Sequence, residues 1–83
     1  MKAKSAKHVV KVIGNKHLNL YPDKDYWYFT YDDSPRVFET HSVLVPRLSD
    51  QTLEEWVDEG RAFCRAVESG NWRDALGVRG FDR

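Results

Sequence analysis

The segment SDQTLEEWVDEGRAFCRAV (residues 49–67) decides the fold, because its apolar residues recur every three or four positions. That spacing is the period of an α-helix with one buried stripe. The stripe consists of Leu53, Trp56, Val57, Gly60, Phe63, Cys64 and Val67. We expect a main helix over residues 50–69, with Ser49 as its N-cap and Gly70 just past its end. Such a helix needs an apolar surface on which to pack.

The residues before this helix form short runs rich in aromatic and β-branched side chains, which favour strands. We expect strands over residues 8–13, 17–21, 26–31 and 37–41, while residues 43–45 either continue the last strand or form a short edge piece. Consecutive strands joined by short turns predict an antiparallel meander. The predicted fold is α+β: a meander of three to four strands within residues 8–45, packed on one face by the C-terminal α-helix. A short helix over residues 71–76 follows it.

The length of 83 residues is that of a single domain, so we expect residues 1–83 to form one unit. Its lysine-rich start, residues 1–6, is expected to fray. The single cysteine excludes an internal disulfide, the cross-link that usually stabilises small secreted domains. Residues 1–16 contain no long apolar run, so neither a signal peptide nor a membrane span is visible. We therefore expect a cytoplasmic protein with no membrane contact.

Charge is distributed unevenly along the chain although the formal net charge is zero. Residues 1–17 contain five lysines and no acid, whereas residues 23–59 contain ten acidic and three basic side chains. Residues 61–83 are basic again, with five arginines and three acids. Such asymmetry influences partner choice and encounter rate, and the acidic middle would attract a basic protein surface. The alternative is that the positive and negative side chains only keep a small domain in solution and do not select a partner.

The run YWYFTY over residues 26–31 is the most unusual stretch, because nearly every residue favours a strand. Side chains alternate between the two faces of a strand. We expect Trp27 and Phe29 to meet the main helix, which leaves Tyr26 and Tyr28 on the outer face. Exposed tyrosines there suit a protein interface or stacking on unpaired bases. Alternatively, the sheet is covered on both sides and both sets are partly buried.

No set of residues in the chain specifies a reaction. The histidines, His8, His17 and His41, lack the spacing of a metal motif and are expected to be polar strand residues. Cys64 lies on the apolar stripe, so we expect a small buried hydrophobe rather than a reactive thiol. The closely spaced aspartate pairs suit turns better than a calcium loop. We therefore predict no catalytic residues, no metal site and no cofactor.

These observations favour a small non-catalytic domain that binds a protein partner with a basic surface. The predicted contact surface consists of Tyr26, Tyr28, Asp32, Asp33, Glu55 and Glu59. The alternative is a nucleic-acid-binding module that uses the N-terminal lysines and the sheet tyrosines. The absence of net positive charge disfavours that alternative, because phosphate neutralisation dominates affinity for nucleic acid. We expect a monomer, or a homodimer in which an edge strand over residues 43–45 pairs with its own copy.

In its size, charge balance and lack of a catalytic set, the chain resembles small accessory proteins of phages and mobile elements. That class includes inhibitors of bacterial defence complexes such as anti-CRISPR proteins. The likeness concerns size and composition and includes no shared motif. It implies an inhibitor or accessory factor of a nucleic-acid-handling complex.

Overall fold

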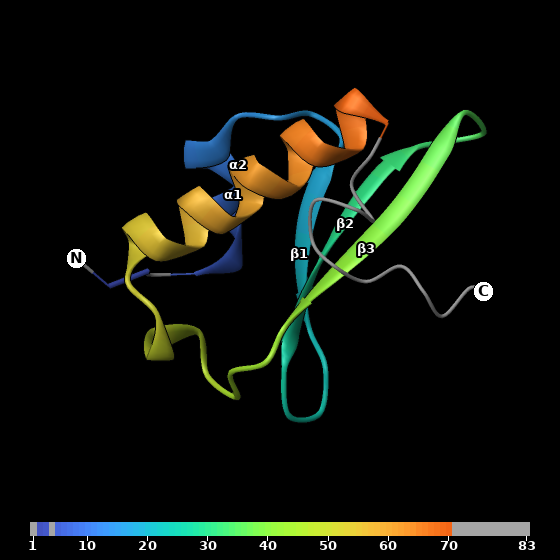
Figure 1. Cartoon of the computed structure of the whole chain (residues 1–83). Helices are drawn as coiled ribbons and strands as arrows, with labels where there is room; N and C mark the ends of the chain where they lie inside the picture. The colour runs from blue at the N-terminus through green and yellow to red at the C-terminus, as the bar shows by residue number, and fades with distance from the viewer. Residues whose placement is uncertain (1, 4, 71–83) are drawn as a thin grey trace.

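The computed structural model describes residues 2–3 and 5–70 of the chain. The element order is α1 (Ala6–Ile13), β1 (Leu18–Pro22), β2 (Trp27–Asp33), β3 (Val37–Val43), the 3-10 turn η1 (Leu48–Asp50) and α2 (Leu53–Ser69) (Figure 1). The strands form one antiparallel sheet in the order β1-β2-β3, so β2 is central. The predicted α+β class is thereby confirmed, with three strands in the sheet. The short helix expected over residues 71–76 lies outside the described residues.

A helix, α1, occupies residues 8–13, so the strand predicted there is wrong. The β-branched residues Val9, Val10 and Ile13 suggested a strand, but together with Ala6 they recur at helical spacing and form one stripe that packs on the core. Ser5 caps this helix by accepting a hydrogen bond from the His8 backbone N–H at 3.1 Å. Gly14 ends it in the left-handed region, at a φ of 76°. Packing of the whole stripe outweighs the strand propensity of its single residues.

Part of the segment expected to fray, residues 1–6, contacts the rest of the domain. Lys2 forms an isolated antiparallel bridge with Thr52, just before α2. Ala3 packs against the hydrophobic core, and α1 begins at Ala6. Lys2 and Ala3 therefore have backbone and apolar contacts with the domain, and the expected fraying of residues 1–6 stays a prediction.

The main helix α2 begins at Leu53, three residues later than expected, and Ser49 is not its N-cap. Thr52 is the cap: its hydroxyl accepts from the Glu55 N–H at 3.1 Å, and the Glu55 carboxylate accepts from the Thr52 N–H at 2.8 Å. This reciprocal pair satisfies two backbone donors, whereas a lone serine would satisfy one. Ser49 lies within η1 instead. Gly70 ends the helix at a φ of 81°, as predicted.

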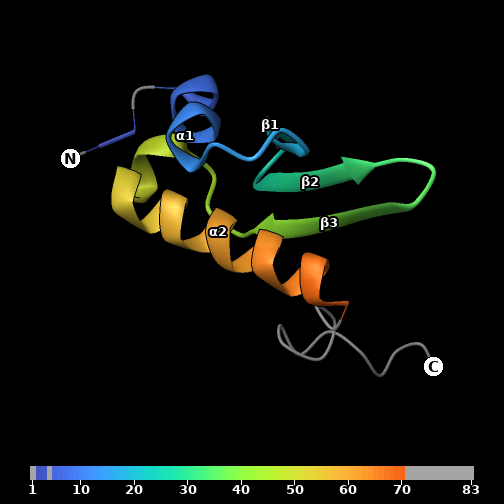
Figure 2. The ribbon, with the colours of Figure 1, turned by 90° about the horizontal axis from the view of Figure 1, so that it is seen from above.

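Both helices lie against the same side of the sheet: α1 packs on β1, and α2 packs on α1 and β2 and reaches β3 through the contacts of His41 with Glu59 and Phe63 (Figures 1 and 2). Trp27 and Phe29 face α2, as predicted. The Trp56 ring meets both edge-on, with centroid distances of 6.2 and 6.0 Å. The buried core residues are Val9, Leu18, Leu20, Phe29, Tyr31, Val43, Trp56, Phe63, Cys64 and Val67. The opposite face of the sheet is covered by neither helix.

Replacing Trp56 by alanine should lower the free energy of unfolding by about 3–5 kcal/mol, as other large core truncations do. Trp56 is fully buried, and its indole N–H donates to the Leu48 carbonyl oxygen at 2.8 Å. Urea unfolding followed by circular dichroism would measure the change. The control is Leu44→Ala, because Leu44 is 81% exposed and should shift the midpoint little. An unchanged midpoint in Trp56→Ala would contradict this placement of the core.

Gly60→Val should destabilise the domain by about 1–3 kcal/mol through overpacking. Gly60 is buried where α2 crosses α1 and β2, and an added Cβ would overlap the Ile13 side chain. The same Cβ would lie 3.1 and 3.2 Å from two atoms of the buried Phe29 ring. Thermal unfolding would measure the effect, with Ala62→Val as the control on the less buried side of α2. Equal melting temperatures in the two variants would contradict the close approach.

Candidate functional site

The six residues predicted as one contact surface lie in three separate places. Tyr26 and Tyr28 lie next to the β1–β2 loop, and Tyr28 points to the outer face of the sheet. Asp32 and Asp33 lie at the other end of β2. Glu55 and Glu59 lie on α2, which covers the inner face. The fold does not bring the six onto a single face.

The outer face of the sheet carries an aromatic cluster around Tyr28. Its ring lies 5.7 Å from that of Tyr21 and 6.3 Å from that of Tyr26. A hydrogen bond to the Asp23 carboxylate raises the pKa of Tyr26. Phe38, on the outer face of β3, is 55% exposed. Sequence reasoning missed Phe38, although the alternation along the strand places it on the same face as Thr40 and Ser42.

The two aspartates at the end of β2 have local partners in the β2–β3 turn. Asp32 accepts hydrogen bonds from the Ser34 N–H at 3.1 Å and from the Ser34 hydroxyl at 2.6 Å, which lower its pKa. Asp33 accepts from the Arg36 Nε–H at 3.0 Å, and this ion pair lowers the pKa of Asp33. These contacts are the turn chemistry expected of aspartates. Because of these contacts, each carboxylate has fewer free acceptor positions for a binding partner.

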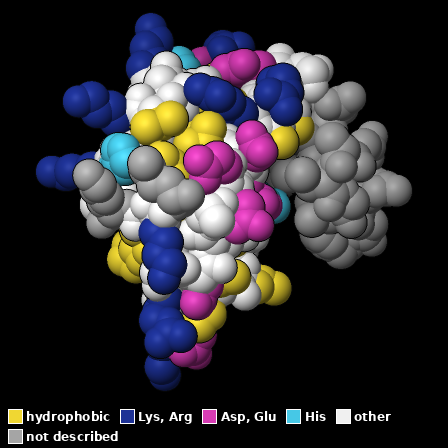
Figure 3. Space-filling view, turned by 90° about the vertical axis from the view of Figure 1, so that its left-hand side faces the viewer, with side chains coloured by type: hydrophobic (Ala, Val, Ile, Leu, Met, Phe, Trp, Pro, Cys, Tyr) yellow, Lys and Arg dark blue, Asp and Glu magenta, His cyan; other side chains and the backbone are white. Residues whose placement is uncertain are grey.

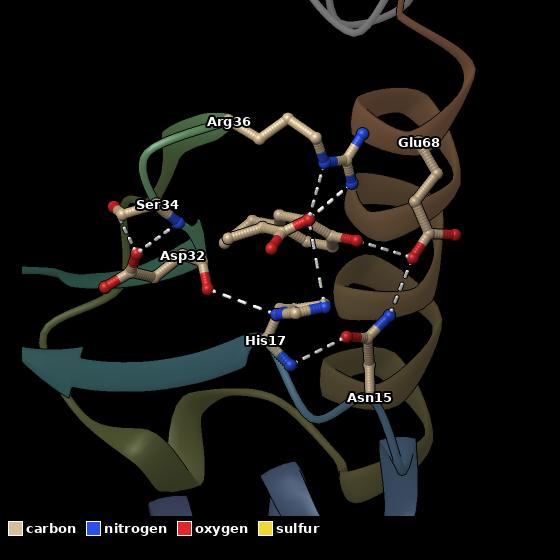
Figure 4. A network of polar contacts seen from close by, with 8 residues as sticks. Asn15, His17, Asp32, Ser34, Arg36 and Glu68 are labelled. Carbon is tan, nitrogen blue, oxygen red and sulfur yellow. Dashed lines mark hydrogen bonds and ion pairs between the residues drawn. The ribbon is translucent and has the colours of Figure 1, made fainter.

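A polar network centred on Glu68 joins the last turn of α2 to the sheet (Figure 4). One Glu68 oxygen accepts from the Tyr31 hydroxyl at 2.8 Å and from the Asn15 side-chain amide at 3.0 Å. Burial and this carboxylate raise the pKa of Tyr31 to about 12. His17 lies just before β1, where its Nδ1 is 3.2 Å from the Asp32 carbonyl oxygen. The network holds three elements together and so acts on stability.

A hollow of about 460 Å³ lies between β3 and the first half of α2. Its lining residues are His41, Gln51, Glu55, Asp58, Glu59 and Ala62. The His41 ring stacks on Phe63 with a centroid distance of 5.6 Å, and its Nε2 lies 2.5 Å from a Glu59 carboxylate oxygen. These contacts fix the imidazole against the core, so one wall of the hollow is rigid.

The hollow is acidic, and no lysine or arginine lines it. Asp58 has no ion pair within residues 2–3 and 5–70, and Glu55 has only its capping contacts with Thr52. The Gln51 Nε2 is buried and lacks a hydrogen-bond partner. Figure 3 shows Asp and Glu side chains in the middle of the face from which α2 starts, with Lys and Arg side chains above, to the left of and below them. The carboxylates suit a cationic group better than an anion, whereas the Gln51 amide N–H is a donor and would need an acceptor such as a backbone carbonyl oxygen.

The hollow was partly readable from the sequence. Glu55, Asp58 and Glu59 fall at helical spacing i, i+3 and i+4, so they share one side of α2. That spacing could have added Asp58 to the predicted surface. His41 gave no such signal, because its contact with Glu59 joins residues 18 positions apart on different elements.

The three histidines lie on different elements: His8 on α1, His17 just before β1 and His41 on β3. Among the residues that the structure describes, no group of three or more metal-ligating side chains could hold a metal ion. Cys64 is buried in the core as predicted, and burial raises the pKa of its thiol to about 11. None of the helices in the described part of the chain has the length and apolar character needed to cross a membrane.

Comparison with known proteins identifies no relative. No protein-family model matches the chain, and neither a curated protein nor a solved structure matches it significantly. The function therefore has to be argued from the surfaces described above.

The free energy of unfolding should fall as the pH rises from about 10 to about 12. The folded protein keeps the Tyr31 proton up to about pH 12, whereas an unfolded tyrosine loses it near its ordinary pKa of 10.0. The unfolded state thus binds fewer protons in this range, and stability decreases with pH. Tyr31→Phe should flatten this part of the curve. Urea unfolding between pH 8 and pH 12 would measure it.

Tyr21→Phe is the matched control, because Tyr21 is exposed on the outer face and donates no hydrogen bond to Glu68. It should keep the slope of the wild-type protein. Identical alkaline curves for wild-type protein and Tyr31→Phe would show that the contact with Glu68 does not govern this pH range.

Proposed function

We propose that this chain is a small non-catalytic domain that binds a protein partner with a basic surface through the hollow between β3 and α2. The observation that carries the proposal is the set of carboxylates there, Glu55, Asp58 and Glu59, with no lysine or arginine in the described lining and the His41 imidazole paired with Glu59. A lysine or arginine of the partner would supply the missing counter-charge.

The grouping of carboxylates around the hollow strengthens the electrostatic argument. An ion pair on an open surface contributes only about 0–1 kcal/mol, because water and salt screen it. The hollow is open and Glu55 and Asp58 are exposed, so what favours a cation there is the presence of several carboxylates around one position, which adds their separate attractions. An arginine guanidinium also has five N–H donors for carboxylate oxygens. The hollow therefore favours one inserted side chain over diffuse attraction.

The arrangement of the other charged and aromatic residues supports a protein partner over nucleic acid. A nucleic-acid module would need basic residues and stacking aromatics on one surface. Lys7 and Lys11 lie on α1, which packs on the inner side of the sheet. Tyr21 and Tyr28 lie on the outer side. The two features needed for binding nucleic acid therefore lie on different sides of the sheet.

A neutral domain with an acidic hollow of this kind is suited to an inhibitor or accessory factor of a nucleic-acid-handling complex, the role implied by the general likeness to phage and mobile-element proteins. Proteins that bind nucleic acid present lysines and arginines to phosphate. The carboxylates of the hollow would occupy such side chains and keep phosphate from them.

A peptide of sequence Arg-Gly-Arg with blocked ends should bind the hollow, because its guanidinium groups supply the counter-charge. Titration of the ¹⁵N-labelled protein at 50 mM salt should shift the amide signals of His41, Glu55, Asp58 and Glu59. The affinity should fall about tenfold or more between 50 and 300 mM salt, as expected when surface charges are screened. The double variant Glu55→Gln, Asp58→Asn should weaken binding by about tenfold, and glutamine at position 55 still suits the cap.

The control for that titration is Asp23→Asn, Asp25→Asn, which removes the same charge from the β1–β2 loop. It should bind as the wild-type protein does. Equal losses in the two double variants would mean that net charge alone attracts the peptide. No shifts at millimolar peptide would overturn the proposal.

A further inference from the structure

β3 is an edge strand that lies beside the acidic hollow. The sheet order β1-β2-β3 places it at one side of the sheet, and its seven residues pair with β2 alone within residues 2–3 and 5–70. Edge strands present unpaired backbone groups that can pair with another chain. His41 belongs both to this strand and to the lining of the hollow.

The register identifies which backbone groups of β3 face outward. The Asp32 N–H donates to the His17 carbonyl oxygen at 2.9 Å, so even-numbered residues of β2 bond toward β1. In an antiparallel ladder the direction alternates, so odd-numbered residues of β2 bond toward β3. Their register partners in β3 are also odd-numbered, from residue 37 to residue 43. The N–H and C=O groups of Phe38, Thr40 and Ser42 therefore point to the free edge.

A strand added at this edge would lie about 4.8 Å from β3. Its side chains on the inner side of the sheet would continue the row that includes His41. That row faces α2, because His41 contacts Glu59 there. A basic side chain at such a position would enter the hollow next to Asp58 and Glu59. The free edge and the hollow are thus two adjacent halves of one site.

Charge favours a foreign basic strand over a second copy of this chain at the edge. Pairing of β3 with β3 of another copy would bring two acidic hollows next to each other, and facing like charges are destabilising. The homodimer expected through residues 43–45 is further disfavoured by local structure. Val45 donates back to the Val43 carbonyl oxygen at 2.9 Å, so the chain turns at that point. A basic partner meets neither obstacle.

We propose that the partner binds as an extended basic segment that adds a fourth strand at the free edge of β3 and inserts a lysine or arginine into the hollow. This proposal rests on the function proposed above and specifies its binding mode. Backbone pairing supplies the general affinity, and the inserted cation selects the segment. This division of roles is the usual one when a peptide adds a strand to a sheet.

A nine-residue peptide that alternates arginine with threonine, with blocked ends, is the probe. We expect it to shift the amide signals of Phe38, Thr40 and Ser42 as well as those of the hollow. Hydrogen exchange at these three amides should slow by about tenfold or more when the peptide is saturating. Two further peptides carry N-methyl groups, one on its odd-numbered residues and the other on its even-numbered residues. In an added strand only one of these two sets of N–H groups faces β3. The peptide methylated on that set should lose at least tenfold in affinity, and the other should bind like the unmodified peptide.

The variant Thr40→Pro tests the same edge from the protein side. Proline is tolerated in an edge strand where its missing N–H would face solvent. The variant should bind the arginine–threonine peptide at least tenfold more weakly while Arg-Gly-Arg still shifts the signals of the hollow. If the variant does not fold, the methylated peptides decide the question.

The outcomes separate this binding mode from the general function. Equal binding of both methylated peptides would overturn strand addition and leave the acidic hollow as the site. A concentration-dependent dimer that disappears in Thr40→Pro would assign the edge to a second copy and overturn the proposal. If neither the long peptide nor Arg-Gly-Arg shifts any signal, both proposals fail.

Discussion

The edge-on contact of the Trp56 ring with Trp27 and Phe29 is the interaction on which the rest of the structure depends. A sheet of three strands with one apolar face is marginal in water unless something covers that face. α2 covers it with its largest buried side chain, and α1 completes the layer along β1. Because Trp56 is also tied to the Leu48 carbonyl oxygen, the same residue sets the path by which the chain leaves β3 and enters α2.

This packing also determines where the acidic side chains lie. Once Trp56, Gly60 and Phe63 face the sheet, the geometry of a helix places Glu55 and Glu59 on the flank toward β3. His41 then meets Glu59, and its ring rests on Phe63. The hollow is therefore built mainly on core contacts between β3 and α2, with Gln51 contributed by the connection that leads into α2. Within this site, His41 is the lining side chain that core contacts hold in place.

The parts of the fold that were predictable from sequence are those in which one strong pattern has no competitor. The stripe of α2 and the alternation around Trp27 and Phe29 belong to this group. The segment of α1 allowed two interpretations, and the β-branched residues favoured the wrong one, although Ser5 and Gly14 are typical helix caps. Thr52 with Glu55 is a readable capping box, and it was overlooked in favour of Ser49. The candidate site was harder to predict, because it depends on a contact between β3 and α2. The two residues of that contact are far apart in the sequence, so no local pattern indicates it.

The order of elements has a consequence for how the protein emerges from the ribosome. Trp56, Phe63 and Val67 belong to the last described element, so the apolar face of the sheet stays open after Val43 has been made. At typical synthesis rates this interval lasts roughly 1–5 seconds before Val67 is added. During that time the part of the apolar face that α2 covers in the finished fold is exposed in the nascent chain, with only α1 packed on β1, and such an apolar surface is one that a chaperone recognises.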